Sequence, residues 1–383
     1  MHDRRTFLGQ SAAAATLLLA APHLAIAQAA TDRRFVFVIQ RGAADGLGTL
    51  APTADPAFAG LRGAFAEDFA GGARIGDYTL HPALAQAAAM AAAREALFVH
   101  AIASPYRDRS HFDGQNVLET GGRAAYVLRD GWMNRLLALL PRAGARAIAV
   151  SATVPMVLRG GREVASYAPS ALPDASDDLL TRVASLYEAD AELHASWAQA
   201  MQTRTLAGDL SGEGGRNGAA TGALAARLLG GAEGARIAVI ETGGWDTHAG
   251  QRARLAFQLR GLDALLGALK AGLGAGWANT LVLVATEFGR TAAANGTGGT
   301  DHGTGALAML LGGAVAGGRV VADWPGLGAS ALHEGRDLRP TLGLDTLIAS
   351  AVSQHYRLDM PRAARALFPN MAGARALDGL IRA

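Results

Sequence analysis

The chain has 383 residues, half of them hydrophobic, and its 35 basic and 33 acidic side chains leave a formal charge of +2. This balance, with no run of basic residues, argues against a nucleic-acid partner. The absence of cysteine excludes disulfides, thiolate ligands and a cysteine nucleophile. Any bound metal must therefore be held by histidine, carboxylate or hydroxyl groups.

The first 27 residues have the pattern of an export signal. The pair Arg4 and Arg5 precedes an apolar stretch over 12–21, which is followed by the small-residue run Ala25-Ile26-Ala27. The apolar stretch is shorter than the roughly 20 residues that span a bilayer, so we expect no permanent membrane anchor. The paired arginines predict export by the twin-arginine translocase to the periplasm or the cell exterior, in a folded state that can already hold a metal.

Residues 28–383 are expected to form a single domain of α/β class, with a mostly parallel central sheet flanked by helices. Four apolar runs rich in β-branched residues predict buried strands over 34–40, 96–102, 236–240 and 280–286. Shorter strands are predicted over 147–151, 155–158, 306–311 and 319–321. Helices are predicted over 82–96, from about Phe112, over 132–140, 250–270 and 343–354, and over most of 175–230, where the glycine-rich patch 207–218 predicts a mobile loop.

Polar side chains follow each of the four buried strands. They are Asp45, then Ser110 and His111, then Asp246 and His248, then Glu287 and Arg290, and a later loop adds Asp301 and His302. Ligands of open α/β sheets bind beyond the carboxyl ends of the strands, so we expect these groups to line one crevice. Mixed imidazole and carboxylate groups suit a divalent metal ion, either zinc, manganese, iron, magnesium or calcium.

Ser110 precedes a predicted helix, and two interpretations remain open for it. It can be a helix cap, or it can be a nucleophile activated by a metal at the anion-attracting end of the helix. Three arginines, Arg107, Arg109 and Arg290, could pair with phosphate or sulfate oxygens, although each alone is equally consistent with a solvated surface charge.

Several stretches, in order along most of the chain, carry a resemblance to a known family. They are Arg41–Leu47, His81–Leu84, Ser104–Asp113, Gly131–Trp132, Asn134–Leu136, Gly243–His248, Glu287–Thr291, Asn295–Gly296, Gly298–Gly303 and Trp324–Leu327. With these stretches the chain resembles the exported bacterial proteins of domain-of-unknown-function family 1501. That family is in turn similar to the alkaline phosphatase and sulfatase superfamily, which implies a metal site at the strand ends.

The resemblance implies a role for each matching position. Ser110 matches the hydroxyl nucleophile at a helix start, and Arg109 and Arg290 stay catalytic candidates through the possible pairing with phosphate or sulfate oxygens described above. The positions that match metal ligands are Asp45, Asp246, His248, Glu287, Asp301 and His302. The chain departs from the superfamily in the two-residue spacing of Asp246 and His248, and in Phe288, which stands where a histidine is expected. A single-metal site, a site completed by His111 and a degenerate site therefore all remain open.

Two functions follow from these observations. The first is an exported metal-dependent hydrolase of a phosphate or sulfate ester, acting on a small molecule or a glycan with Ser110 as nucleophile. The alternative is a non-catalytic binding or assembly protein of the cell envelope on the same scaffold, in which a metal only holds the loops together. An oxidoreductase ranks last, because no dinucleotide-binding glycine pattern follows the first strand.

Overall fold

A computed structural model describes residues 32–141, 146–168, 177–188, 190–207, 217–231, 234–369, 371 and 375–382. The predicted signal peptide, residues 1–27, and most of the glycine-rich patch 207–218 lie outside these residues. No helix in the described ranges is both long enough and apolar enough to cross a membrane.

The centre of the molecule is a nine-stranded sheet with the order β11-β5-β10-β9-β1-β8-β6-β7, to which β12 adds by pairing with β5. Its strands are β1 (Arg34–Gln40), β5 (Ala96–Ala103), β6 (Ala147–Val150), β7 (Ala165–Ser166), β8 (Ile237–Thr242), β9 (Thr280–Thr286), β10 (Ala306–Leu311), β11 (Arg319–Val321) and β12 (Leu342–Gly343). Only β10 runs antiparallel to its neighbours in this sheet. The carboxyl ends of β5, β9, β1 and β8 therefore lie at one edge.

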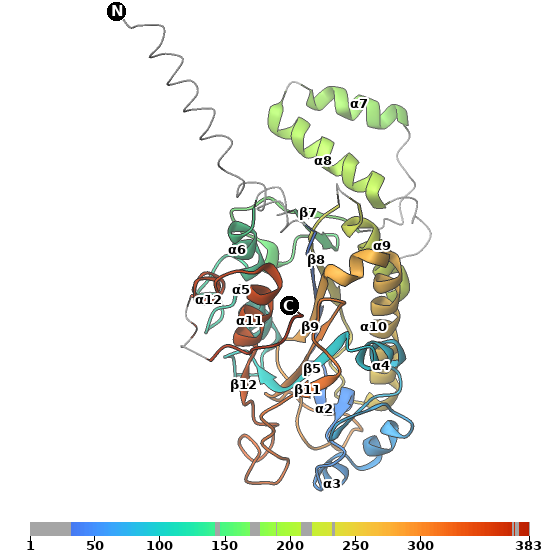
Figure 1. Cartoon of the computed structure of the whole chain (residues 1–383), viewed down its shortest axis with the longest axis vertical. Helices are drawn as coiled ribbons and strands as arrows, with labels where there is room; N and C mark the ends of the chain where they lie inside the picture. The colour runs from blue at the N-terminus through green and yellow to red at the C-terminus, as the bar shows by residue number, and fades with distance from the viewer. Residues whose placement is uncertain are drawn as a thin grey trace, which may run out of the picture.

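Two layers of helices cover the sheet (Figure 1). One layer holds α4 (Ala85–Ala92), α9 (Gly218–Leu229) and α10 (Gln251–Leu273), and the other holds α5 (His111–Thr120), α6 (Trp132–Leu139), α11 (Leu344–Tyr356) and α12 (Met360–Leu367). Strand β1 is buried on both faces because its side chains alternate between two cores. Phe35, Phe37 and Ile39 pack in one core, and Val36 and Val38 pack in the other.

Smaller elements complete the described part of the chain. A three-stranded sheet has the order β2-β4-β3, from β2 (Leu50–Ala51), β3 (Arg74–Ile75) and β4 (Tyr78–Leu80). The short helices are α2 (Gly46–Thr49), α3 (Phe58–Arg62), η2 (Gly63–Phe69), η4 (Met156–Leu158) and η5 (Gly274–Asn279). The two helices α7 (Asp177–Tyr187) and α8 (Ala191–Ala207) project from the sheet and its helical layers (Figure 1).

The predicted fold class is confirmed, and the four buried strands are found within two residues of their predicted limits. The predicted strand over 155–158 is wrong. Pro155 begins a tight 3₁₀ turn in which the Leu158 amide donates to the Pro155 carbonyl at 3.0 Å, so this apolar run buries its side chains without pairing to a strand. The prediction of a single domain over 28–383 stays a prediction.

Candidate metal centre

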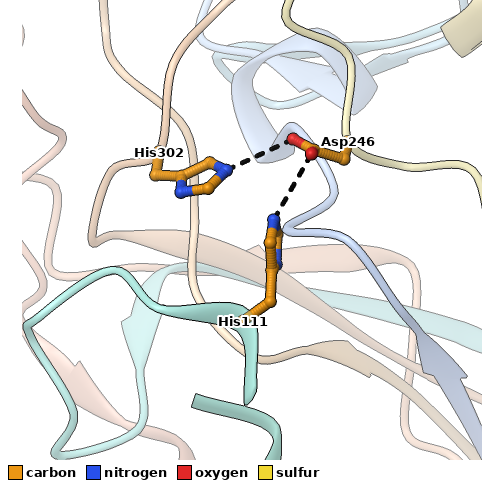
Figure 2. Close-up of side chains that lie close together, drawn as sticks. All are labelled: His111, Asp246 and His302. Atoms are coloured by element: carbon orange, nitrogen blue, oxygen red, sulfur yellow. Dashed lines mark hydrogen bonds and ion pairs between the residues drawn. The ribbon is translucent and has the colours of Figure 1, made fainter. Parts of the chain in front are cut away.

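Two imidazoles and one carboxylate meet at the sheet edge that the sequence indicates. His111 is the first residue of α5, Asp246 follows β8, and His302 lies in the loop before β10. The Nε2 atom of His111 is 3.5 Å from Asp246 Oδ2, and that of His302 is 3.3 Å from Asp246 Oδ1 (Figure 2). The three ligand atoms lie within 4.8 Å of one another, which is close enough for them to hold one metal ion.

A third imidazole, that of His248, completes the cluster on its solvent side. Its Nε2 atom lies 3.0 Å from Asp246 Oδ1 and 3.0 Å from His302 Nε2. The His248 side chain is 46% exposed, against 24% for His111 and 25% for His302. His248 is therefore placed to give a fourth donor at the rim of the cluster.

Each imidazole is oriented by an oxygen atom that accepts a hydrogen bond from its other nitrogen. Nδ1 of His111 donates to Glu287 at 2.8 Å, Nδ1 of His302 donates to the Arg109 carbonyl at 2.9 Å, and Nδ1 of His248 donates to Asp301 at 3.0 Å. A carboxylate or carbonyl can only accept, so in the neutral rings the proton is on Nδ1 and the Nε2 lone pair is directed at the cluster. Metal-ligating histidines are oriented in this way.

The charge of the cluster also fits a divalent cation. Three carboxylates, those of Asp246, Glu287 and Asp301, surround the imidazoles, and the only arginine that pairs with any of them in the described ranges is Arg290. His111 Nε2 is buried without a hydrogen-bond partner, although buried polar atoms are normally satisfied. The donor set, the charge and this unsatisfied nitrogen all fit a metal ion held by imidazole and carboxylate, as zinc commonly is.

Arg290 holds the Asp246 carboxylate from the interior of the protein. Its side chain is fully buried and its Nη1 donates to Asp246 Oδ1 at 2.6 Å, while Nε donates to Thr300 Oγ1 at 3.1 Å and Nη2 donates to the Thr300 carbonyl. Desolvation acts to raise the pKa of Asp246, but the hydrogen bond and charge of Arg290 outweigh it and lower the pKa. In this arrangement Arg290 holds the Asp246 carboxylate in place and keeps it ionised.

Glu287 lies behind His111 and is completely buried. It accepts hydrogen bonds from the Gly42 amide at 2.9 Å, the Thr286 hydroxyl at 2.8 Å and the Gln115 amide at 3.2 Å, in addition to the one from His111. Burial would raise the pKa of Glu287, yet these donors lower it, and the hydrogen bond to Glu287 is the main cause that raises the pKa of His111. The structure thus gives Glu287 an orienting position behind the imidazole. Its predicted role as a direct ligand stays a prediction.

Asp45 is not brought into the cluster. Both of its carboxylate oxygens accept hydrogen bonds from the Arg62 guanidinium, and Gln251 donates to one of them. Asp45 and Arg62 are each 1% exposed, and the guanidinium also donates to backbone carbonyls at Thr291 and Ala292. Desolvation acts to raise the pKa of Asp45, but the charge of Arg62 and its hydrogen bonds lower it. Asp45 therefore has a structural role, as the buried counter-charge of Arg62.

The segment before α5 places Ser110 directly beside His111. Ser110 is in the N-cap position, but its side chain makes no capping hydrogen bond, and its amide donates to the Tyr106 hydroxyl at 3.0 Å. Arg109 pairs with Asp337 at 2.8 Å and with Glu334. Arg107 donates to the carbonyls of Ser104 and Tyr106. The three predicted guanidinium groups are thus not gathered at the cluster. Arg290 pairs with Asp246 through its guanidinium, whereas Arg109 contacts His302 only through its backbone carbonyl.

Phe288 forms an apolar wall beside the cluster. Its ring stacks on His111 with 5.1 Å between centroids and an interplanar angle of 24°, and its centroid is 5.3 Å from that of His302. The position where the resemblance implies a histidine is therefore filled by a ring that packs against two imidazoles.

Two polar residues that support the cluster, Asn295 and Thr300, were not predicted from the sequence. Asn295 donates to Asp301 at 3.1 Å and to the His248 carbonyl at 2.9 Å, while Thr300 accepts from Arg290. Both belong to stretches that carry the family resemblance. At Gly299 a side chain would come within 2.2 Å of the His248 backbone, so only glycine allows these two loops to approach. Gly299 is therefore the sequence signal from which the close approach of the two loops could have been predicted.

Comparison with known proteins identifies the family. The model of the family described as protein of unknown function (DUF1501) matches residues 81–367, and the chain belongs to this family, as the sequence resemblance predicts. No curated protein matches significantly.

Two solved structures are similar to the chain at low sequence identity. One is the phosphonate monoester hydrolase of Agrobacterium radiobacter, with 11% identity and a TM-score of 0.36, over 76% of this chain and 70% of that one. The other is a Bacteroides thetaiotaomicron protein from its metabolism of multiple glycosaminoglycans, with 9% identity and a TM-score of 0.34, over 75% of this chain and 68% of that one.

Proposed function

We propose that this chain is a metal-dependent hydrolase of a phosphate or sulfate ester carried by a small molecule or a glycan. The metal would be held by His111, Asp246 and His302, with His248 as a further donor. The observation that carries the proposal is the arrangement of the imidazoles, whose Nδ1 atoms are fixed by oxygen acceptors while their Nε2 atoms face Asp246. When bound, a divalent metal polarises an ester oxygen and lowers the pKa of a bound hydroxyl group.

The residues of the chain would prepare this chemistry by orientation and charge. Arg290 keeps Asp246 ionised, and Glu287 keeps the His111 ring in position. Ser110 is the candidate nucleophile, because it directly precedes His111 at the amino end of α5 and its hydroxyl makes no capping hydrogen bond. A helix amino end favours the negative charge that an attacking alkoxide and the ester oxygens bring there.

A second function is supported by one specific observation. Arg109 and Arg290 already pair with carboxylates, so neither is free to form a fork with ester oxygens as the structure stands. Three imidazoles and one carboxylate can also fill all four positions of a tetrahedral metal, which is typical of a structural site. A binding or assembly protein of the cell envelope, whose metal fixes the loops, is therefore the alternative proposal.

Metal content and turnover together separate the two proposals. We expect the purified protein to hold one divalent metal per chain, measured by elemental analysis, and to hydrolyse nitrophenyl phosphate or sulfate. Ser110→Ala should retain the metal and lose at least about 100-fold in turnover, whereas His302→Ala should lose both. Ser330→Ala and His333→Ala are matched controls outside the cluster and should change neither. Bound metal with no turnover of esters in the native chain would favour the envelope protein.

The proposal includes export. Residues 1–27 carry the twin-arginine pattern that supports it. Cell fractionation should find the native chain in the periplasm or the medium, and a variant with Arg4→Lys and Arg5→Lys should accumulate in the cytoplasm. Export of both chains alike would contradict this route.

A further inference from the structure

A cleft lies beside the segment that leads into the metal centre, and three residues of that segment, Ser104, Pro105 and Arg107, line it. Its volume is about 300 Å³, which is the size of a site for a small organic ligand. Its walls come from the end of β5, the segment after it, β12 and the start of α11. None of the residues that line it belongs to the histidine cluster.

The polar lining of this cleft is mainly cationic. Two arginines, Arg107 and Arg123, line it together with the hydroxyl-bearing residues Ser104, Thr341 and Thr346. Asp345 is the only acid among its described lining residues, and Asp345 Oδ1 already accepts a hydrogen bond from the Thr346 amide at 2.7 Å.

Arg107 is held in a fixed position by its own segment. Its Nη1 donates to the carbonyls of Ser104 and Tyr106, and the described residues offer it no carboxylate within ion-pair distance. Burial lowers its pKa because desolvation disfavours the charged guanidinium. A fixed, partly desolvated guanidinium is suited to bind an oxyanion, since its planar nitrogens can donate two parallel hydrogen bonds.

We propose that this cleft is a binding site for a small oxyanion, either a sulfate, a phosphate or a carboxylate group, with Arg107 and Arg123 as its cationic contacts. The site is separate from the metal centre and does not depend on the proposed hydrolase activity. It also gives Arg107 a different place from the one predicted from sequence, because the guanidinium lies at this cleft and not with Arg290.

Titration calorimetry of the full protein with sulfate, phosphate and citrate tests the proposal, with the three anions distinguishing inorganic from carboxylate ligands. We expect saturable binding of at least one anion. Arg107→Gln and Arg123→Gln should each weaken it by about tenfold or more. Asp345→Asn should tighten it, because it removes the one negative charge from the lining while keeping an oxygen that can accept from Thr346.

Two control variants separate this site from other sources of binding. Arg260→Gln, at an exposed arginine on α10, should leave the affinity unchanged. So should His302→Ala, which damages the metal centre, when all the proteins are titrated in metal-free form. If Arg107→Gln does not fold, the proposal is still tested by the other two variants, since Arg123→Gln should weaken anion binding and Asp345→Asn should tighten it. No binding of any of the three anions, or binding lost only in His302→Ala, would overturn the proposal.

Discussion

Asp45 and Asp246 follow neighbouring parallel strands, β1 and β8, and both match metal-binding acids in the family resemblance, yet they have opposite surroundings. Asp45 is 1% exposed and closed inside the Arg62 ion pair. Asp246 is 42% exposed and faces three imidazoles, with one arginine behind it. Equivalent positions at a sheet edge can thus lie inside a buried ion pair in one case and in a half-exposed cluster of possible metal ligands in the other.

Substitution of the two acids should differ most in its effect on the free energy of unfolding. Asp45→Asn should lower the free energy of unfolding by about 3–5 kcal/mol, because it leaves the buried Arg62 without a counter-charge. Asp246→Asn should cost less, since the Asp246 carboxylate is 42% exposed and water can solvate that side of its pair with the buried Arg290. Urea unfolding of metal-free protein measures both, and equal losses would remove the distinction.

Metal affinity should show the reverse order. Asp246→Asn alters a proposed direct ligand and should weaken metal binding by more than about 100-fold, which exceeds the effect of losing an outer partner. Asp45→Asn should leave the affinity within a few-fold of the native value at temperatures where it is folded. Competition with a chromophoric chelator gives both numbers, and a large loss in Asp45→Asn would place Asp45 at the metal after all.

Glu287 should have an intermediate effect, through His111. Glu287→Gln keeps an acceptor for the imidazole but removes its charge, so metal affinity should fall by about 10–100-fold. Glu241→Gln is the matched control, because Glu241 pairs with Arg41 and contacts no imidazole of the cluster. An unchanged affinity in Glu287→Gln would show that the His111 ring needs no charged partner.

The smallest effect concerns the pH dependence of stability near Asp45. Burial lowers the pKa of His100 to about 4, so below about pH 6.5 the unfolded chain binds a proton that the folded chain does not. Stability should therefore fall as the pH falls from 6.5 towards 4, by about 2 kcal/mol at pH 5 from this group alone. His100→Gln should remove this part of the dependence between pH 7 and 5. Parallel curves for the two proteins would contradict the assignment.

The strands and the position of the site were predictable from sequence because both depend on local patterns. A run such as 34–40 is apolar at nearly every position, and this predicts burial on both faces whatever packs there. The loops after such runs must gather at one edge, which predicted that Asp246, His248 and His302 lie together.

The partners of each acid were not predictable, because they depend on tertiary contacts. Nothing near Asp45 in the sequence indicates that Arg62 closes on it, and nothing near Glu287 indicates that it supports His111 from 176 residues away. The failed strand at 155–158 has a similar cause. Its residues are apolar, but whether an apolar run pairs with a strand or folds into a turn depends on what lies beside it.

The imidazoles of the cluster come from distant parts of the chain, so the proposed metal binding would be coupled to folding. His248 and His302 are 54 residues apart, and the His302 ring in turn contacts that of His111, an arrangement that needs β5, β9 and β8 aligned in the sheet. In the unfolded chain, a metal ion could gather these imidazoles only by closing long loops, which costs conformational entropy. In the folded chain the imidazoles are already together, so we expect it to bind the metal far more strongly. Free metal at 100 times its dissociation constant would then add about 2.7 kcal/mol to stability.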